Sequence, residues 1–347
     1  MLTQLAAKFR RERMPLAARR SYRMAITLSL VLAAAYGLNI GIPFLAPLFV
    51  VILMAKPAPP PGPKQLFILL IAVAVSLGVG LLLGPLLQKS PVAALIIIVG
   101  GLYASNRLVI AQGKVAIGTL LALGLTVVSA ASSISSALAS MLIAALVMGI
   151  AVAVIGQWIV YPFFPEDNTM VKPEVPPPAQ DVSWLSWRAT LIVVPAFLIT
   201  LINPAMYLPL TVKSILLGRE ASQLQLQDAN RELIGSTFLG GLCAVLVWGC
   251  LSLSVSLWFY FAWVLVISIV LASGVYGVMK TKFKPTFWTA TLTTMIILLG
   301  AAVQDSANGK DVYQAFFVRM LLFMAIAVYA ALAMSLLEKW RNRRIKT

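Results

Sequence analysis

Long apolar runs, separated by short polar or proline-rich joints, dominate the chain. Twelve such runs can be distinguished, and their lengths favour helices over strands. The runs of the first half cover residues 24–38, 44–55, 66–87, 92–106, 115–131 and 138–161. Those of the second half cover residues 189–202, 206–217, 233–251, 257–278, 286–303 and 315–337. Because little sequence is left for a water-facing domain, we predict an all-α polytopic membrane protein with about 12 transmembrane helices.

The two halves of the chain follow the same plan. Landmark residues recur at matching places: Arg23 and Arg188, Asn39 and Asn203, Lys56 and Arg219, Lys64 and Arg231, and Lys114 and Lys284. Self-similarity of this kind is typical of transporter and channel folds built from duplicated bundles. Since each half has an even number of runs, both halves enter the membrane from the same side, and we expect two parallel six-helix repeats.

The run from residue 24 to residue 55 admits a second interpretation, as one helix that leaves five spans per half. Such a helix would be roughly 48 Å long at ~1.5 Å per residue, against a hydrocarbon core of ~30 Å. Both of its ends, Arg23 and Lys56, are basic. A hairpin that returns to its starting side satisfies the length and the charge together, and we therefore predict a hairpin.

Composition and charge agree with a membrane location. Hydrophobic residues make up 61% of the chain and charged residues 11%, a balance that a water-facing surface does not tolerate. The formal net charge is +16, but the basic residues stand at the ends of apolar runs instead of forming one compact face, so we expect no nucleic-acid partner. By the positive-inside rule, both termini lie in the cytoplasm of a multi-pass protein of the bacterial inner membrane.

Polar segments divide the chain into five parts. We expect a basic N-terminal segment at 1–22, the first repeat at 23–165, a proline-rich linker at 166–186, the second repeat at 187–338 and a basic tail at 339–347. The N-terminal cluster superficially resembles a cleaved export signal. The second half begins with a similar pattern that cannot be a signal, so we expect the first helix to remain.

Reactive residue types are sparse. There is no histidine, and the two cysteines, Cys243 and Cys250, share one apolar run, which disfavours zinc sites and a disulfide framework. No nucleophile with a neighbouring base, no phosphate-binding loop and no cluster of carboxylates stands out in the apolar runs. We therefore expect no enzymatic activity, no cofactor and no metal.

Each half contains a short hairpin that turns at helix-breaking residues. The breaks include Asn39 and Pro43 in the first half, and Asn203, Pro204 and Pro209 in the second. Paired breaks in corresponding segments are a good sequence indicator of a transport site, because the freed backbone groups must face protein or a water-filled cavity. We place these residues along a substrate path; two ordinary turns at the membrane surface are the alternative.

Three ionisable residues fall within or beside apolar runs. Lys213 lies in the short arm of the second half, where it would either meet an anionic substrate or extend to the interface. Asp305 ends one run and Arg319 lies near the start of the next. This pair is a hypothetical gate or proton-coupling site; two solvated helix ends are the alternative.

Glycines also recur in the third run of each half, and they include Gly80 and Gly84 in the first half and Gly240 and Gly241 in the second. Small residues let helix backbones approach closely, so we expect close helix contacts at these positions.

Several motifs resemble one known superfamily. The first half combines Arg23 at the entry to its first run with KPAPPPGPK at 56–64 and QWIVYPFFPED at 157–167, and the second half contains ELIGST at 232–237. Together they resemble a compact branch of the fusaric acid resistance and aromatic acid exporter superfamily, without the cytosolic domain that larger members carry between the halves.

The resemblance implies export of aromatic carboxylic acids, often with a periplasmic membrane-fusion adaptor and an outer-membrane channel. A plant branch forms organic-anion channels from paired six-helix units, which implies a path between the halves.

Our leading hypothesis is an inner-membrane efflux permease for small organic anions, with proton drive as one option. The alternatives are a passive organic-anion channel and a non-transporting membrane anchor for a periplasmic adaptor. The expected partners are the lipid bilayer, the anion and such an adaptor, and a homo-oligomer is compatible with the sequence.

Overall fold

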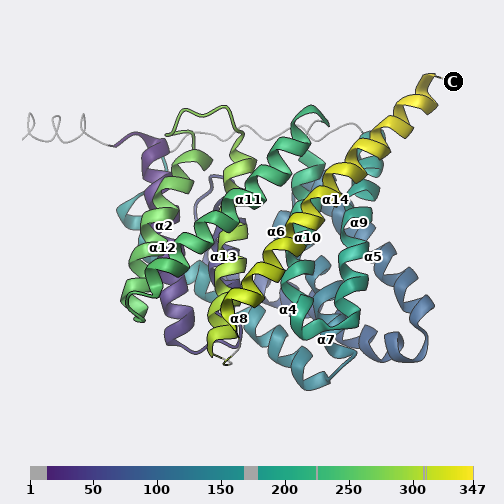
Figure 1. Ribbon diagram of the computed structural model, residues 1–347, viewed down its shortest axis with the longest axis horizontal. Helices are drawn as coiled ribbons and strands as arrows, with labels where there is room; N and C mark the ends of the chain where they lie inside the picture. The colour runs from purple at the N-terminus through teal and green to yellow at the C-terminus, as the bar shows by residue number, and fades with distance from the viewer. Residues whose placement is uncertain (1–13, 168–178, 224–225, 308, 310, 347) are drawn as a thin grey trace, which may run out of the picture.

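The structure is a computed structural model that describes residues 14–167, 179–223, 226–307, 309 and 311–346. Within these residues the protein is a bundle of α-helices (Figure 1). Much of the expected N-terminal segment and of the linker between the halves, and the last residue of the basic tail, lie outside the described residues.

Each of the twelve predicted runs corresponds to one helical segment. The first half contains α2 (Leu16–Gly37), α3 (Leu45–Met54), α4 (Pro63–Lys89), α5 (Pro91–Gln112), α6 (Val115–Leu123), the π-helix η1 (Gly124–Val128), α7 (Ser129–Ser132), α8 (Ser136–Val160) and the 3-10 helix η2 (Tyr161–Phe163). The second half contains α9 (Ala179–Ile202), α10 (Pro204–Gln223), α11 (Leu226–Leu251), α12 (Leu257–Val275), α13 (Pro285–Ala307) and α14 (Val312–Lys346). The correspondence treats α6, η1 and α7 as one continuous segment, Val115–Ser132.

Nine helical segments of the described chain are long and apolar enough to cross a membrane, and α2, α3 and α10 are not among them. Helix α3 has 10 residues, about 15 Å, which is half of a hydrocarbon core. Helix α2 begins with three arginines, and α10 carries Lys213, Arg219 and Glu220. The protein is therefore a polytopic membrane protein with nine candidate spans.

The first hairpin is formed as predicted. Helix α2 ends at Gly37, and the chain turns before α3 begins at Leu45. Asn39 adopts a left-handed conformation with φ of 51°, which asparagine tolerates better than most residues. The interpretation of residues 24–55 as one continuous helix is wrong, because this turn interrupts it.

The helices run back and forth between two edges of the molecule. Figure 1 shows that α2 begins and α14 ends at the same edge, at the top of the view. We call this the terminal edge and the opposite one the far edge. Since successive helices alternate in direction, α3 and α10 end at the terminal edge, where α4, α6 and α13 begin.

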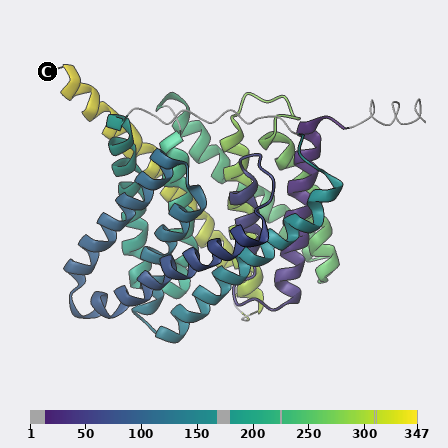
Figure 2. The ribbon, with the colours of Figure 1, turned by 180° about the vertical axis from the view of Figure 1, so that it is seen from behind.

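The two halves interlock. Helix α12 packs against α2, and α5 packs against α9, so each half places one helix against the first helix of the other. Helix α3 also contacts α13, and α10 contacts α6 and η1. Figure 2, the reverse view, shows the blue helices of the first half in front. Helix α13 lies inside the bundle, and most of its side chains are buried.

Glycines permit close contacts within each half, as the sequence predicted. A Cβ atom on Gly80 of α4 would lie 1.9 Å from the carbonyl oxygen of Gly124, the first residue of η1. A Cβ atom on Gly240 of α11 would lie 2.6 Å from the carbonyl oxygen of Thr291 on α13. Any side chain at Gly80 or Gly240 would therefore separate the paired helices.

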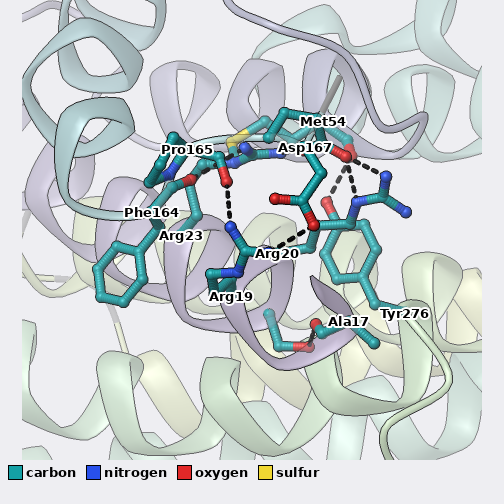
Figure 3. Close-up of polar contacts among 11 residues, drawn as sticks. Ala17, Arg19, Arg20, Arg23, Met54, Phe164, Pro165, Asp167 and Tyr276 are labelled. Carbon is teal, nitrogen blue, oxygen red and sulfur yellow. Dashed lines mark hydrogen bonds and ion pairs between the residues drawn. The ribbon is translucent and has the colours of Figure 1, made fainter. Parts of the chain in front are cut away.

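Ion pairs join the start of α2 to the segment after α8 (Figure 3). The Glu166 carboxylate accepts hydrogen bonds from Arg20 and from Arg23, the latter at 2.8 Å, and Asp167 accepts one from Arg19 at 2.7 Å. Partial burial alone would raise the pKa of Glu166, but the hydrogen bonds and charges of Arg20 and Arg23 lower it below its ordinary value of 4.5. The carboxylate is thus an ionised clasp between the two ends of the first half.

The second half has a comparable clasp. Arg188 of α9 donates to Glu338 of α14 at 2.8 Å, and Arg341 of α14 pairs with Asp181 of α9. In both halves, therefore, ion pairs at the terminal edge connect the first helix to the last helix or to the segment after it.

Candidate functional site

A cavity of about 560 Å³ lies between the two halves at the terminal edge. Its walls come from the end of α3, the second turn of α4, the start of α6, the end of α10 and the start of α13. The lining residues are Ile52, Leu53, Ala55, Lys56, Leu69, Gly113, Lys114, Val115, Ala116, Ile117, Leu216, Arg219, Glu220, Pro285, Thr286, Thr289 and Thr293. We call it the basic cavity.

Basic side chains outnumber acidic ones in this wall. Lys56 and Lys114 come from the first half and stand exposed, while Arg219 and Glu220 come from α10 and are half-buried. Three positive charges therefore face one carboxylate. Cavities walled by one sign of charge and by low-dielectric protein concentrate ions of the opposite sign, so this cavity favours anions.

A stripe of hydroxyl groups completes the polar wall. Thr286, Thr289 and Thr293 recur at helical spacing and lie on one face of α13. Apolar residues from α3, α4 and α6 form the opposite wall. The cavity therefore combines a charged rim, a line of hydrogen-bonding groups and an apolar surface, a combination that suits a small organic anion.

Arg219 connects the two halves. Its Nη1 donates to the hydroxyl of Thr119 on α6 at 2.8 Å. A void of about 10 Å³ beside the cavity is lined by Thr119 together with Phe49 of α3 and Ile150 of α8. Arg219 thus joins the wall of the cavity to a residue that lines this smaller void.

Lys213 lies deeper on the same helix. Its side chain has 0% exposure, and its ammonium donates to the hydroxyl of Thr294 on α13 at 2.7 Å. The alternative prediction, that this side chain extends to the interface, is wrong. Within the described residues Thr294 is its single hydrogen-bond acceptor, although an ammonium can donate three hydrogen bonds. Glu220 is seven residues away, about two turns along the helix.

The helix-breaking residues of the two hairpins do not line the cavity. Asn39 and Pro43 lie in the turn between α2 and α3 at the far edge. The Oδ1 of Asn203 accepts the backbone N–H of Met206 at 3.3 Å, and Pro204 is the first residue of α10. These residues set where the two short arms begin, while the cavity lies at the other ends of those arms.

Pro209 interrupts the backbone hydrogen bonds inside α10. Nearby, the hydroxyl of Thr200 on α9 donates to the carbonyl oxygen of Tyr207 at 3.1 Å and shares a hydrogen bond with the hydroxyl of Thr211. These contacts join α9 to α10 beside the break.

Asp305 and Arg319 form a buried ion pair at the far edge. Both Asp305 oxygens accept from the Arg319 guanidinium, with 3.2 Å between Nη2 and Oδ1. The two residues are 3% and 9% exposed, so the alternative of two solvated helix ends is wrong. The pair lies 16 residues beyond Thr289 on α13, or about 24 Å from the cavity.

Sequence reasoning did not identify Glu220 or the threonine stripe of α13 as site residues. The threonine spacing was a usable signal, because three hydroxyl residues on one helical face are unexpected in a buried apolar helix. Glu220 gave no such signal, since it follows Arg219 at the end of a helix and could have been part of a solvated joint.

Within the part of the chain that the structure describes, no group of three histidine, cysteine, aspartate or glutamate residues could hold a metal ion. The described part includes both cysteines, which are free.

Comparison with known proteins gives one match. A family model described as "Protein of unknown function (DUF2955)" matches residues 20–160, less than half of the chain. This range runs from the start of α2 to the end of α8. No curated protein and no solved structure matches the chain significantly.

Proposed function

We propose that this protein transports small organic anions across the membrane, and that the basic cavity is its binding chamber. The observation that carries the proposal is the cavity itself: about 560 Å³ between the two halves, with Lys56, Lys114 and Arg219 facing the single carboxylate of Glu220. A volume of this size accommodates a small organic molecule. The excess of positive charge in the wall specifies an anion.

Lys213 supports the same proposal. A buried ammonium in a membrane protein costs several kcal/mol and by default marks a functional site. It lies between α10 and α13, both of which also supply walls of the cavity. We propose that Lys213 receives the anion as it moves inward from the cavity. The aromatic carboxylate class is suggested by the likeness to the fusaric acid resistance and aromatic acid exporter superfamily.

We further propose that the path runs between two parallel six-helix repeats. Three observations support a duplicated unit. The contacts of α12 with α2 and of α5 with α9 are equivalent under such a duplication, as are those of α3 with α13 and of α10 with α6. The clasps Arg23–Glu166 and Arg188–Glu338 occupy comparable places. The matching family model covers one unit, α2 to α8.

In this proposal all twelve helical segments belong to the membrane domain, with the short arms α3 and α10 next to the path. The terminal edge, where the basic joints gather, faces the cytoplasm of a bacterial inner membrane by the positive-inside rule. The cavity then opens toward the cytoplasm, as expected for the loading site of an exporter. The Asp305–Arg319 pair would close the far edge as a gate.

Flux measurements on reconstituted protein test the proposal. Benzoate or 4-hydroxybenzoate is added outside vesicles in which the terminal edge of the protein faces outward. Accumulation of the acid inside the vesicles is then measured. Arg219→Gln and Lys213→Met should each lower the flux at least about tenfold, the equivalent of about 1.4 kcal/mol. Lys89→Gln, which removes an exposed lysine at the end of α4 near the far edge, is the matched control and should leave it unchanged.

The same assay separates the alternatives. Flux that follows the membrane potential and ignores a pH gradient identifies a passive channel. A folded protein that moves none of a panel of aromatic acids, and that binds a periplasmic adaptor, identifies a non-transporting anchor and overturns the proposal. Equal flux in the wild type, in Arg219→Gln and in Lys213→Met would remove the cavity and Lys213 from the path.

A further inference from the structure

Glu220 is the one carboxylate among the residues that line the basic cavity. It stands beside Arg219 and on the same face of α10 as Lys213, two turns away. We propose that Glu220 binds a proton when the cavity binds an anion, so that anion binding is accompanied by proton uptake. This inference rests on the proposed function and adds to it the group that couples protons to the anion.

The geometry makes Glu220 the counter-charge of the empty cavity. It interacts electrostatically with Lys213 and Arg219 on its own helix. Its Oε2 atom is buried and has no hydrogen-bond partner among the described residues. A carboxylate oxygen without a donor beside two cations is a suitable place for a proton once another anion neutralises those cations.

The other charged groups on the surrounding helices have partners or stand at the rim. Glu232 of α11 repels Glu220 and accepts the hydroxyl of Thr286 at 3.0 Å, while Arg231 lies over the ring of Phe283 at 4.9 Å. The segment Val115–Ser132 contains no titratable residue. The remaining nearby charges are Lys56 and Lys114 at the rim, Lys284 before the start of α13, and the Arg188–Glu338 pair between α9 and α14.

Competition for the same cations produces the coupling. While Glu220 is ionised, it offsets part of the positive charge that would attract an anion. When a carboxylate ligand occupies the cavity, the ligand offsets this positive charge instead of Glu220. Repulsion between the two carboxylates then favours the protonated form of Glu220. A hydronium ion at the terminal edge donates the proton: one of its O–H bonds breaks, one O–H bond forms on a Glu220 oxygen, and a water molecule is released. Linkage requires the reverse as well, so protonation strengthens anion binding.

Asp305 is less suited to this role. Both of its oxygens accept from Arg319, and the pair lies at the far edge, away from the cavity. A proton on Asp305 would have to displace an arginine, whereas Oε2 of Glu220 accepts no hydrogen bond from the described residues.

Calorimetric titration of the purified full-length protein with benzoate, in two buffers of different ionisation enthalpy, counts the protons. The wild type should take up about one proton per benzoate at neutral pH, and Glu220→Gln should take up none. Glu220→Gln, which resembles the protonated state, should also bind benzoate about tenfold more tightly at neutral pH and with little dependence on pH. Glu220→Asp retains a titratable group and should restore the uptake.

Asp311→Asn is the matched control. Asp311 is an exposed carboxylate whose side chain accepts backbone N–H groups at the start of α14, a role that asparagine fills as well. It should leave the proton count unchanged. Proton uptake that is equal in the wild type and in folded Glu220→Gln overturns the inference while leaving anion binding intact.

Absence of benzoate binding at every pH would instead count against the proposed function. Infrared difference spectra between acidic and alkaline pH then decide the role of Glu220 independently. A carboxylic-acid band that is present in the wild type, missing in Glu220→Gln and displaced in Glu220→Asp supports a proton on this residue. A band that is the same in all three proteins overturns it.

Discussion

Helices α3 and α10 occupy comparable places in the two halves, yet their side chains differ in kind. Helix α3 is entirely apolar and almost completely buried, and it packs against α8 and α13. Helix α10 buries Lys213 and presents Arg219 and Glu220 to the cavity. Both helices contact the other half of the protein, so a difference in position does not explain their different side chains. The comparison shows that α3 contributes only apolar packing, whereas α10 brings charged side chains to the wall of the cavity, as the proposed binding role requires.

The difference between α3 and α10 has a physical basis. Burial of aliphatic side chains stabilises the bundle, whereas a buried ammonium costs free energy, so a helix that only packs gains nothing from one. Changes to α3 should then affect mainly stability, and changes to α10 mainly transport.

The largest loss of stability is expected from a substitution at the far end of α13, beside the start of α3, where the Asp305–Arg319 pair is buried. Asp305→Asn leaves the Arg319 guanidinium buried beside a neutral amide, and we expect a loss of about 3–5 kcal/mol in the free energy of unfolding. Denaturation in a defined detergent measures it. The double variant Asp305→Asn with Arg319→Met should recover most of the loss, and a single variant as stable as the wild type would contradict a buried pair.

Within α3 itself, Leu48→Ala should cost about 2–5 kcal/mol, because it opens a cavity in a fully buried site. Transport per folded molecule should remain close to that of the wild type. Leu82→Ala, which truncates an exposed leucine on α4, is the control and should leave stability unchanged. A folded Leu48→Ala protein with strongly reduced transport would assign α3 a direct part in the path.

For α10, the contact between Lys213 and α13 can be isolated by a double-mutant cycle. Thr294→Val removes the acceptor of a buried ammonium and should destabilise the protein by about 1–3 kcal/mol. Lys213→Met removes the desolvation cost and should leave stability unchanged or higher. When residue 213 is already methionine, Thr294→Val should cost clearly less stability than it does in the wild type. If the effects of the two substitutions simply add, the two side chains do not interact.

The smallest effect on stability is expected from the clasp between Glu166 and the arginines at the start of α2. The folded-state pKa of Glu166 is lowered, so its ionised form contributes stability above its ordinary value of 4.5, and that contribution is lost as the pH falls through the lowered value. Because the pair is partly solvated, we expect less than about 1 kcal/mol. Glu166→Gln should flatten the stability profile below this pH, and an identical slope in both proteins would rule out the clasp as its source.

Much of the fold could be predicted from the sequence, because it depends on local properties. The alternation of apolar runs and basic joints predicted twelve helical segments of the described chain, although only nine of them are candidate membrane spans. The length of residues 24–55, compared with the thickness of the bilayer, predicted the hairpin. Glycines at corresponding places predicted the close contacts at Gly80 and Gly240. All these features follow from hydropathy, chain length and backbone sterics, which can be read within one run.

The site depended on tertiary structure. Lys213 could be suspected from its place in an apolar run, but only the packing of α10 on α13 decided that its ammonium ends on Thr294 and not in solvent. The proline and asparagine breaks pointed to the far edge, whereas interlocking of the halves placed the cavity at the opposite ends of the same arms. Glu220, Arg219 and the threonines of α13 meet the first half there through contacts between distant parts of the chain. Such contacts are set by how the helices pack together, and no single apolar run contains that information.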